Sequence, residues 1–169
     1  MNFELTKEVL LRVYGTVLVK SVVKHVRVVG AAGIAEITGP QQQRLTPCVT
    51  NELCGAEGIS AGMVQMGPGM VSKAHYHAHS EIVVVCLRGR AATLVGPELT
   101  PYFHGPGEFI FIPEGVIHVA VNLSETDDIV AMEMRTDPHF NRDVVLTPEY
   151  DAEIAEIATR LRLSDAMAS

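Results

Sequence analysis

The sequence predicts an all-β fold, an antiparallel sandwich or barrel, with a helical arm at each end. From about residue 26 onward the chain consists of short apolar runs of strand length. Clusters of glycine, proline, serine and aspartate, which favour turns, separate these runs. No long helical pattern lies between them, which is typical of sheets built from hairpins rather than of alternating strands and helices.

Residues 1–25 form the first predicted segment, an N-terminal helical arm. Polar side chains recur every fourth position, from Glu8 and Arg12 to Lys20 and Lys24, and valine and leucine cover most of the remaining surface. This spacing predicts an amphipathic helix with a wide apolar face. Such a basic helix could lie on an anionic membrane. Packing against its own domain or a second subunit is the commoner role of a wide apolar face.

Residues 26–146 form the predicted barrel. Within residues 129–135, valine and methionine alternate with alanine, Glu133 and Arg135, which predicts a strand with two different faces. The block of strands shows no internal repeat, so we expect one barrel. Strands are expected at residues 26–29, 59–66, 71–77, 82–87, 91–95, 109–112, 117–121, 129–134 and 144–146.

Residues 147–169 form the last predicted segment, a C-terminal helix and tail. Thr147 can cap the helix and Pro148 suits its first position. We expect this helix to pack against the outside of the barrel, because apolar side chains recur at helical spacing, at Ile154, Ile157, Ala158 and Leu161.

The charge and the cysteines restrict the partners and the compartment. Thirteen lysines and arginines against 20 aspartates and glutamates give a net charge of −7, which disfavours a nucleic-acid partner. No stretch approaches the roughly 18 to 20 apolar residues that cross a bilayer, and the N-terminus lacks a signal-peptide pattern. We therefore expect a cytoplasmic protein with no membrane partner. Its cysteines are expected to be reduced rather than joined as a Cys48–Cys54 disulfide.

Three histidines and a glutamate predict a metal site inside the barrel. His75 and His77 lie two residues apart in a predicted strand, so their side chains point to the same face. A turn would bring Glu81 back beside them, and glycine hairpins could place the strand of His118 alongside. Divalent iron, manganese, nickel, copper or zinc accepts such ligands. On spacing alone, the histidines could equally be surface residues or a satisfied buried pair.

The segment around His75 and His77 resembles the first motif of the cupin superfamily. Gly69 is followed by five residues, then by His75 and His77, and after three more residues by Glu81. The interval from Glu81 to Gly89 is seven residues, one longer than in the family pattern. This difference suggests a shifted turn or bulge after Glu81.

A second segment resembles the second cupin motif and matches it without a gap. Gly107, Pro113, Gly115, His118 and Asn122 stand at the motif spacing. The resemblance covers roughly residues 26–146, and the chain looks most like small single-domain cupins in which a Gly-Met-Val-Ser segment precedes the histidines.

This resemblance implies a jelly-roll barrel of six to eight strands with the site inside. It also implies a homodimer, to which residues 6–24 could contribute. One divalent transition metal per chain is implied, with iron first and manganese, nickel, zinc or copper as alternatives. Its implied ligands are His75, His77, Glu81 and His118.

Four protein ligands would leave two positions open on a six-coordinate metal. We therefore expect a metal-dependent oxygenase, most readily a dioxygenase, acting on a small, largely apolar or oxygen-chelating molecule. A non-redox isomerase, lyase or cyclase and a cupin that binds metal or a small ligand without turnover are the alternatives. His104 is interpreted as a hairpin residue. The candidate acid–base residues are His79, Tyr76, Tyr102 and Gln65.

Overall fold

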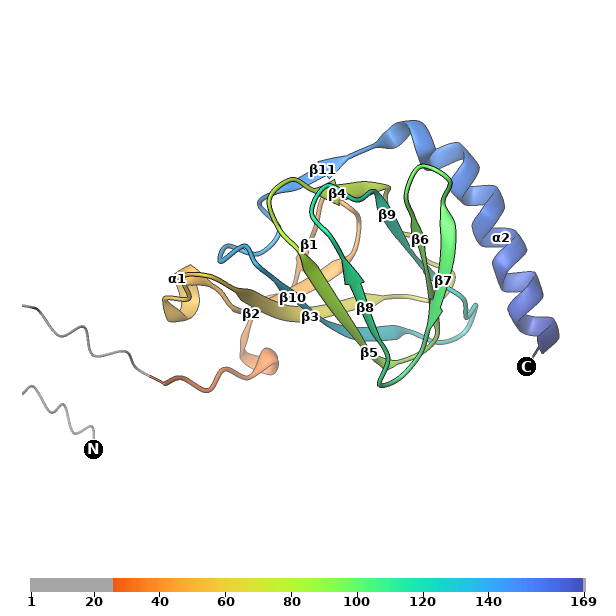
Figure 1. Cartoon of the computed structure of the whole chain (residues 1–169). Coiled ribbons are helices and arrows are strands. Elements are labelled where there is room, and N and C mark those ends of the chain that lie inside the picture. The colour runs from red at the N-terminus through yellow and green to blue at the C-terminus, as the bar shows by residue number, and fades with distance from the viewer. Residues whose placement is uncertain (1–25, 169) are drawn as a thin grey trace, which may run out of the picture.

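The computed structural model describes residues 26–168, in which two antiparallel sheets face each other (Figure 1). One sheet contains, in spatial order, β1 (Ile37–Thr38), β2 (Arg44–Val49), β3 (Ser60–Met66), β10 (Ile129–Arg135), β5 (Ile82–Arg88) and β8 (Phe109–Ile112). The other contains β11 (Val144–Leu146), β4 (His75–His77), β9 (His118–Asn122), β6 (Ala91–Val95) and β7 (Thr100–His104). The predicted all-β jelly-roll fold is confirmed.

Helices occupy the connections and the C-terminal end of the described chain. The short ones are η1 (Ala31–Gly33), α1 (Asn51–Cys54) and η2 (Pro148–Tyr150), and the long one is α2 (Asp151–Ala168). The N-terminal helix expected within residues 1–25 lies outside the described residues.

Helix α2 covers the outer face of the five-stranded sheet, beside β6 and β7 in Figure 1. Ile154 and Ala158 are buried there, and Ile157 and Leu161 pack against the same cluster. The apolar stripe predicted from the sequence is therefore the packing face of the helix. On the sheet, the side chains that it covers include Ala92, Leu94, Val119 and Val121.

The outer face of the six-stranded sheet is largely apolar, and no described helix covers it. Its side chains form two rows across the sheet, because the strand register aligns Phe111 with Val83, Met134 and Ala61, and Phe109 with Val85, Met132 and Met63. Phe109 and Phe111 are 70% and 57% exposed. An exposed apolar patch of this kind is typical of an interaction surface.

Several strand expectations differ from the structure, and the strand expected at residues 71–77 is confined to His75–His77. Residues 26–29 form no strand, and Val26 and Val28 are almost fully exposed. Strands β1, β2 and β7 were not among the expected strands. Both β2 and β7 contain a proline, which cannot donate a hydrogen bond to a neighbouring strand. The structure accommodates Pro47 at a register shift of β2 and Pro101 on the edge strand β7.

Candidate metal centre

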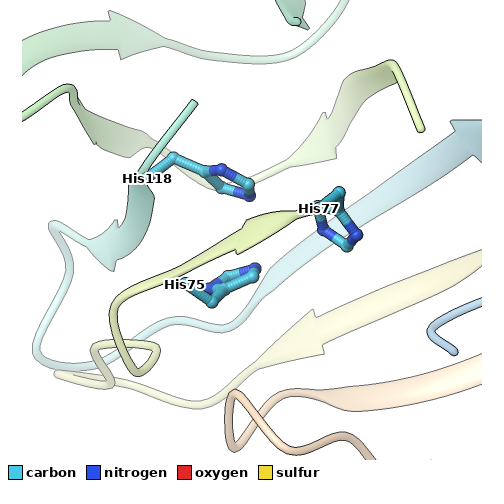
Figure 2. Close-up of side chains that lie close together, drawn as sticks. All are labelled: His75, His77 and His118. Atoms are coloured by element: carbon cyan, nitrogen blue, oxygen red, sulfur yellow. The ribbon is translucent and has the colours of Figure 1, made fainter. Parts of the chain in front are cut away.

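Three histidines converge inside the barrel from two neighbouring strands (Figure 2). His75 and His77 point inward from β4, and His118 of β9 lies directly opposite His75. The ring centroid of His75 lies 4.3 Å from that of His118 and 5.4 Å from that of His77. All three residues are buried, and their ligand nitrogens lie within 4.8 Å of one another, so they can hold one metal ion.

A glycine turn fixes the strand that carries His118. Gly115, in the connection between β8 and β9, has a φ of +73°, a conformation that favours glycine. Its backbone N–H donates to the carbonyl oxygen of His77 at 2.9 Å. The turn of the second motif is thereby joined to the strand of the first, which brings the distant His118 beside His75.

The hydrogen bonds of the rings determine which nitrogen of each histidine faces the centre. The Nδ1 atoms of His75 and His118 lie 2.7 Å and 2.9 Å from the carbonyl oxygens of Lys73 and Val116. Because a carbonyl can only accept, both Nδ1 atoms carry the proton and both Nε2 atoms keep a free lone pair.

His77 follows the same pattern with a carboxylate as its partner. Its Nδ1 donates to Oδ1 of Asp143 at 3.0 Å, and its buried Nε2 has no hydrogen-bond partner within the described residues. A buried nitrogen without a partner is costly unless something binds it. A divalent transition metal fits this set of three imidazole donors.

Burial keeps all three rings neutral, which is the form that binds a metal. It is the largest cause of the lowered pKa of each ring: well below the ordinary value for His75, below it for His77, and about 4 for His118. Arg135 lowers all three pKa values further, and neighbouring histidines also lower those of His75 and His118.

Asp143 orients His77 from behind. It also accepts hydrogen bonds from the Ser80 hydroxyl at 2.5 Å and the His79 backbone N–H at 3.2 Å. Burial alone would raise the pKa of Asp143, but the hydrogen bonds from Ser80 and His77 outweigh it and lower the pKa. The carboxylate therefore stays ionised and keeps the ring in the orientation that directs Nε2 inward.

Replacement of Asp143 by asparagine should weaken metal binding. We expect the dissociation constant for Co²⁺ to rise about 10- to 100-fold, the range found when groups that orient metal-ligating histidines are removed. Competition with a chromophoric chelator would measure it. Asp128→Asn is the matched control because Asp128 is a half-exposed carboxylate whose ion partner is Arg44. Equal affinities in the two variants would contradict the role of Asp143.

A cavity of about 50 Å³ lies beside the histidines. It borders His75 and His118, and most of its wall is apolar, including Val64, Met66 and Ile112. Water needs roughly 10–15 Å³ of such space per molecule, so the cavity accommodates only a few non-hydrogen atoms. A molecule bound there would sit in a largely water-free environment.

The structure does not bring Glu81 to the histidines, and the expectation for this ligand is corrected. Its side chain is exposed, and its backbone N–H donates to Thr136. The next residue, Ile82, points inward and lines the cavity. The reason is register: a shift of one residue along a strand moves a side chain to the other face.

The spacing of the first motif contains a signal for this register. Four residues separate His77 from Ile82 and six separate Ile82 from Gly89. If Ile82 rather than Glu81 is aligned with the glutamate of the motif, the interval to Gly89 has the six residues of the family pattern. An isoleucine then occupies the glutamate position.

None of the four candidate acid–base residues lines the cavity. His79 is exposed, and Tyr76 is half-buried on the face of β4 opposite the histidines. Tyr102 is 54% exposed on β7. Gln65 faces outward from β3, between two buried neighbours.

Polar residues that the sequence interpretation did not select line the cavity instead. They are Gln43, Thr93, His104 and Glu133. Nε2 of His104 lies 2.9 Å from the Thr93 hydroxyl, and burial lowers the pKa of His104. The hairpin interpretation of His104 was therefore incomplete, because the end of β7 turns this ring inward. For Glu133 the alternation of β10 was recognised, but the pattern does not indicate which face is inside.

Comparisons with known proteins identify the fold. The family model described as cupin matches residues 31–164. The structure is similar to oxalate decarboxylase from Lactobacillus farciminis, with 17% identity and a TM-score of 0.60 over 72% of this chain and 36% of that one. It is also similar to a Klebsiella pneumoniae protein with a double-stranded β-helix domain, with 14% identity and a TM-score of 0.55 over 73% and 98% of the two chains.

The chain covers different shares of these two proteins. The chain spans about a third of the length of the oxalate decarboxylase, and at such identities the similarity concerns the fold alone. No curated protein matches the sequence. Between residues 26 and 168, no helix is both long and apolar enough to cross a membrane.

Proposed function

Because the chain belongs to the cupin family, we propose that it is a metal-dependent enzyme acting on a small organic molecule inside the barrel, as an oxygenase with divalent iron. The observation that carries the proposal is the convergence of three neutral imidazoles. Each Nδ1 atom donates a hydrogen bond to an oxygen away from the centre, so each Nε2 atom is free to bind a metal. Histidine-rich centres with open positions suit iron-dependent oxygen chemistry.

The histidines would bind the metal, and the cavity would bind the substrate. His75, His77 and His118 would hold the ion, which when bound supplies Lewis acidity and an electron relay to oxygen. Three protein ligands leave more positions for substrate and oxygen than the four expected from the sequence. The apolar wall excludes water from the bound molecule, which strengthens the electrostatic interactions at the site.

The cavity restricts the substrate to a small molecule. Its volume of about 50 Å³ and its wall of aliphatic side chains suit a compact, largely apolar compound with one or two groups that bind the metal. Among the described residues, no lysine or arginine lines the wall, which disfavours a phosphorylated substrate.

Metal analysis combined with oxygen uptake tests the proposal. The protein reconstituted with Fe²⁺ should bind one ion per chain and consume oxygen with compact chelating substrates such as short-chain thiols. No uptake of any transition metal would refute the metal centre. Turnover that is independent of air, with zinc or nickel bound, would support the non-redox isomerase, lyase or cyclase instead, and bound metal without turnover would support a binding protein.

We also propose that the protein forms a homodimer through the outer face of the six-stranded sheet. The support is its apolar surface, where Phe109, Phe111, Met132 and Met134 form parallel rows. A twofold axis would place the same rows of a second copy against them, as a self-complementary interface requires. The opposite sheet is not available in the same way, because α2 covers its outer face.

Two acidic substitutions should dissociate this dimer. Light scattering on Phe109→Glu/Phe111→Glu is expected to give 18.3 kDa, the mass of one chain, where the unmodified protein gives twice that value. Leu163→Glu is the control, because Leu163 is 64% exposed on α2. A dimer that survives the double substitution would place the interface elsewhere.

A cytoplasmic location is proposed from the cysteines. All three cysteines of the chain lie within the described residues and are free. Free thiols are typical of proteins in reducing compartments. Fractionation of cells that produce the protein at native level would test this, and recovery from an oxidising compartment would contradict it.

A further inference from the structure

We propose that Glu133 provides the carboxylate that the first motif lacks in the cavity, as a hydrogen-bond acceptor and not as a metal ligand. It faces the open side of the metal centre from the opposite sheet and accepts a hydrogen bond from the protic group, of water or of the substrate, that occupies an open position on the metal. The inference rests on the metal centre of the proposed function. The substrates that fit this site are compounds that bind the metal through a hydroxyl, amine or thiol.

The position of Glu133 in β10 supports this role. Alternate residues of β10 are buried, and Glu133 is 5% exposed on the inner face. It lines the same cavity as His75 and His118, which lie on the other sheet. A molecule bound in the cavity therefore lies between the histidines and this carboxylate.

Arg135 holds the carboxylate in place from outside the cavity. Its Nε donates to Oε1 of Glu133 at 2.5 Å, and its Nη1 donates to Asn141 at 3.1 Å. The guanidinium carbon lies 4.5 Å from the ring centroid of Phe140. Arg135 itself does not line the cavity. These contacts fix the arginine, which in turn fixes one oxygen of Glu133.

The second carboxylate oxygen remains available to a ligand. The hydrogen bond that Glu133 accepts from Arg135 uses Oε1 and not Oε2. The Glu133 side chain keeps 7% of its surface accessible, whereas the Arg135 side chain keeps none. The accessible part of this ion pair is therefore the carboxylate, and it faces the cavity.

No acidic side chain enters the cavity at the glutamate position of the first motif. Ile82 lines the cavity there, and Glu81 is exposed. A buried ion pair contributes little net stability compared with apolar side chains of similar volume. A charged pair beside three histidines is therefore better explained by the chemistry of the site than by folding.

The charge of Glu133 also determines which ligands the centre prefers. A carboxylate accepts hydrogen bonds but cannot donate them. A protic ligand on the metal gains a hydrogen bond from it, whereas an anion without a proton meets a like charge. Removing this charge should therefore weaken the binding of a dication and strengthen the binding of an anion.

Opposite changes in two affinities test the inference. In Glu133→Gln, the dissociation constant for Co²⁺, measured on the metal-free protein, should rise about 10- to 100-fold. The dissociation constant of azide for the Co²⁺-loaded protein, followed by visible absorption, should fall about threefold or more. Glutamine keeps the shape and the acceptor for Arg135. Glu81→Gln, which removes an exposed charge, should change neither value.

The outcomes are distinguishable. Unchanged affinities in Glu133→Gln, or weaker binding of both Co²⁺ and azide as general damage would cause, would overturn the inference. If Glu133→Gln does not fold, Glu133→Gln/Arg135→Gln removes both charges, and the same two changes are expected with smaller size because Arg135 does not line the cavity. Unmodified protein that takes up no Co²⁺ would refute the metal centre and the inference together.

Discussion

His118→Ala is expected to abolish stoichiometric metal binding. His118 is one of three imidazoles that converge, and it alone comes from β9. Loss of a group that merely orients a ligand already weakens binding about 10- to 100-fold, so loss of a ligand should exceed 100-fold. Elemental analysis after reconstitution with Fe²⁺ or Co²⁺ should find far less than one ion per chain.

Glu81→Ala is the matched control for this result. It removes a side chain that the family motif would make a ligand but that the structure leaves exposed. We expect full metal content in this variant. Circular dichroism of the metal-free His118→Ala protein should show the same sheet content as the unmodified protein, so that loss of metal is not attributed to unfolding. Metal retained in His118→Ala, or lost in Glu81→Ala, would contradict the assignment of ligands.

The histidines could be predicted from the sequence because two simple regularities place them. The period of two along a strand puts His75 and His77 on one face, and the spacing of the second motif marks His118. The apolar stripe of α2 was predictable for the same kind of reason, since Ile154 and Ala158 recur at helical spacing and are buried. Local periodicity was sufficient in these cases.

The positions of Glu133 and Glu81 could not be predicted from the two-residue period of a strand alone. A period of two separates the faces of β10 but does not say which one is inside. The apolar face, with Met132 and Met134, would normally be assigned to the core, yet it faces outward and Glu133 faces the cavity. For Glu81, a shift of one residue was enough to exchange a carboxylate for Ile82. Which face of a strand lies inside depends on how the sheets pair, and the local pattern does not contain this information.

Asp143 was missed for a different reason. It lies 66 residues from His77 and belongs to neither motif, so the sequence carries no local sign of its contact. The pairing of β11 with β4 creates that contact, because Val144 stands opposite His77 and brings the preceding residue next to the ring. Groups that orient ligands from remote strands generally need the fold before they can be recognised.

Acid is expected to destabilise the metal-free protein strongly between pH 6.5 and pH 4. Burial lowers the pKa of His118 from 6.5 to about 4 in the folded state. As the pH falls through this window, the unfolded chain binds a proton that the folded chain does not, so the free energy of unfolding decreases. The contribution of the neutral His118 ring to the free energy of unfolding is fully present above pH 6.5. About 3 kcal/mol of it is lost by pH 4. His75 and His77 shift in the same direction.

Urea unfolding with a chelator present, at pH 7, 5.5 and 4, would measure this loss. The matched variant is His118→Gln, whose side chain does not titrate, so its free energy of unfolding should fall less steeply by up to about 3 kcal/mol. Parallel curves for the two proteins would contradict the shift. Because metal and protons compete for the same nitrogens, the metal-loaded protein should lose stability more steeply over the same window. Burial keeps the three imidazoles neutral, which leaves each a free lone pair for a metal. The same burial lowers the stability of the metal-free protein in acid, because the unfolded chain binds protons that the folded chain does not.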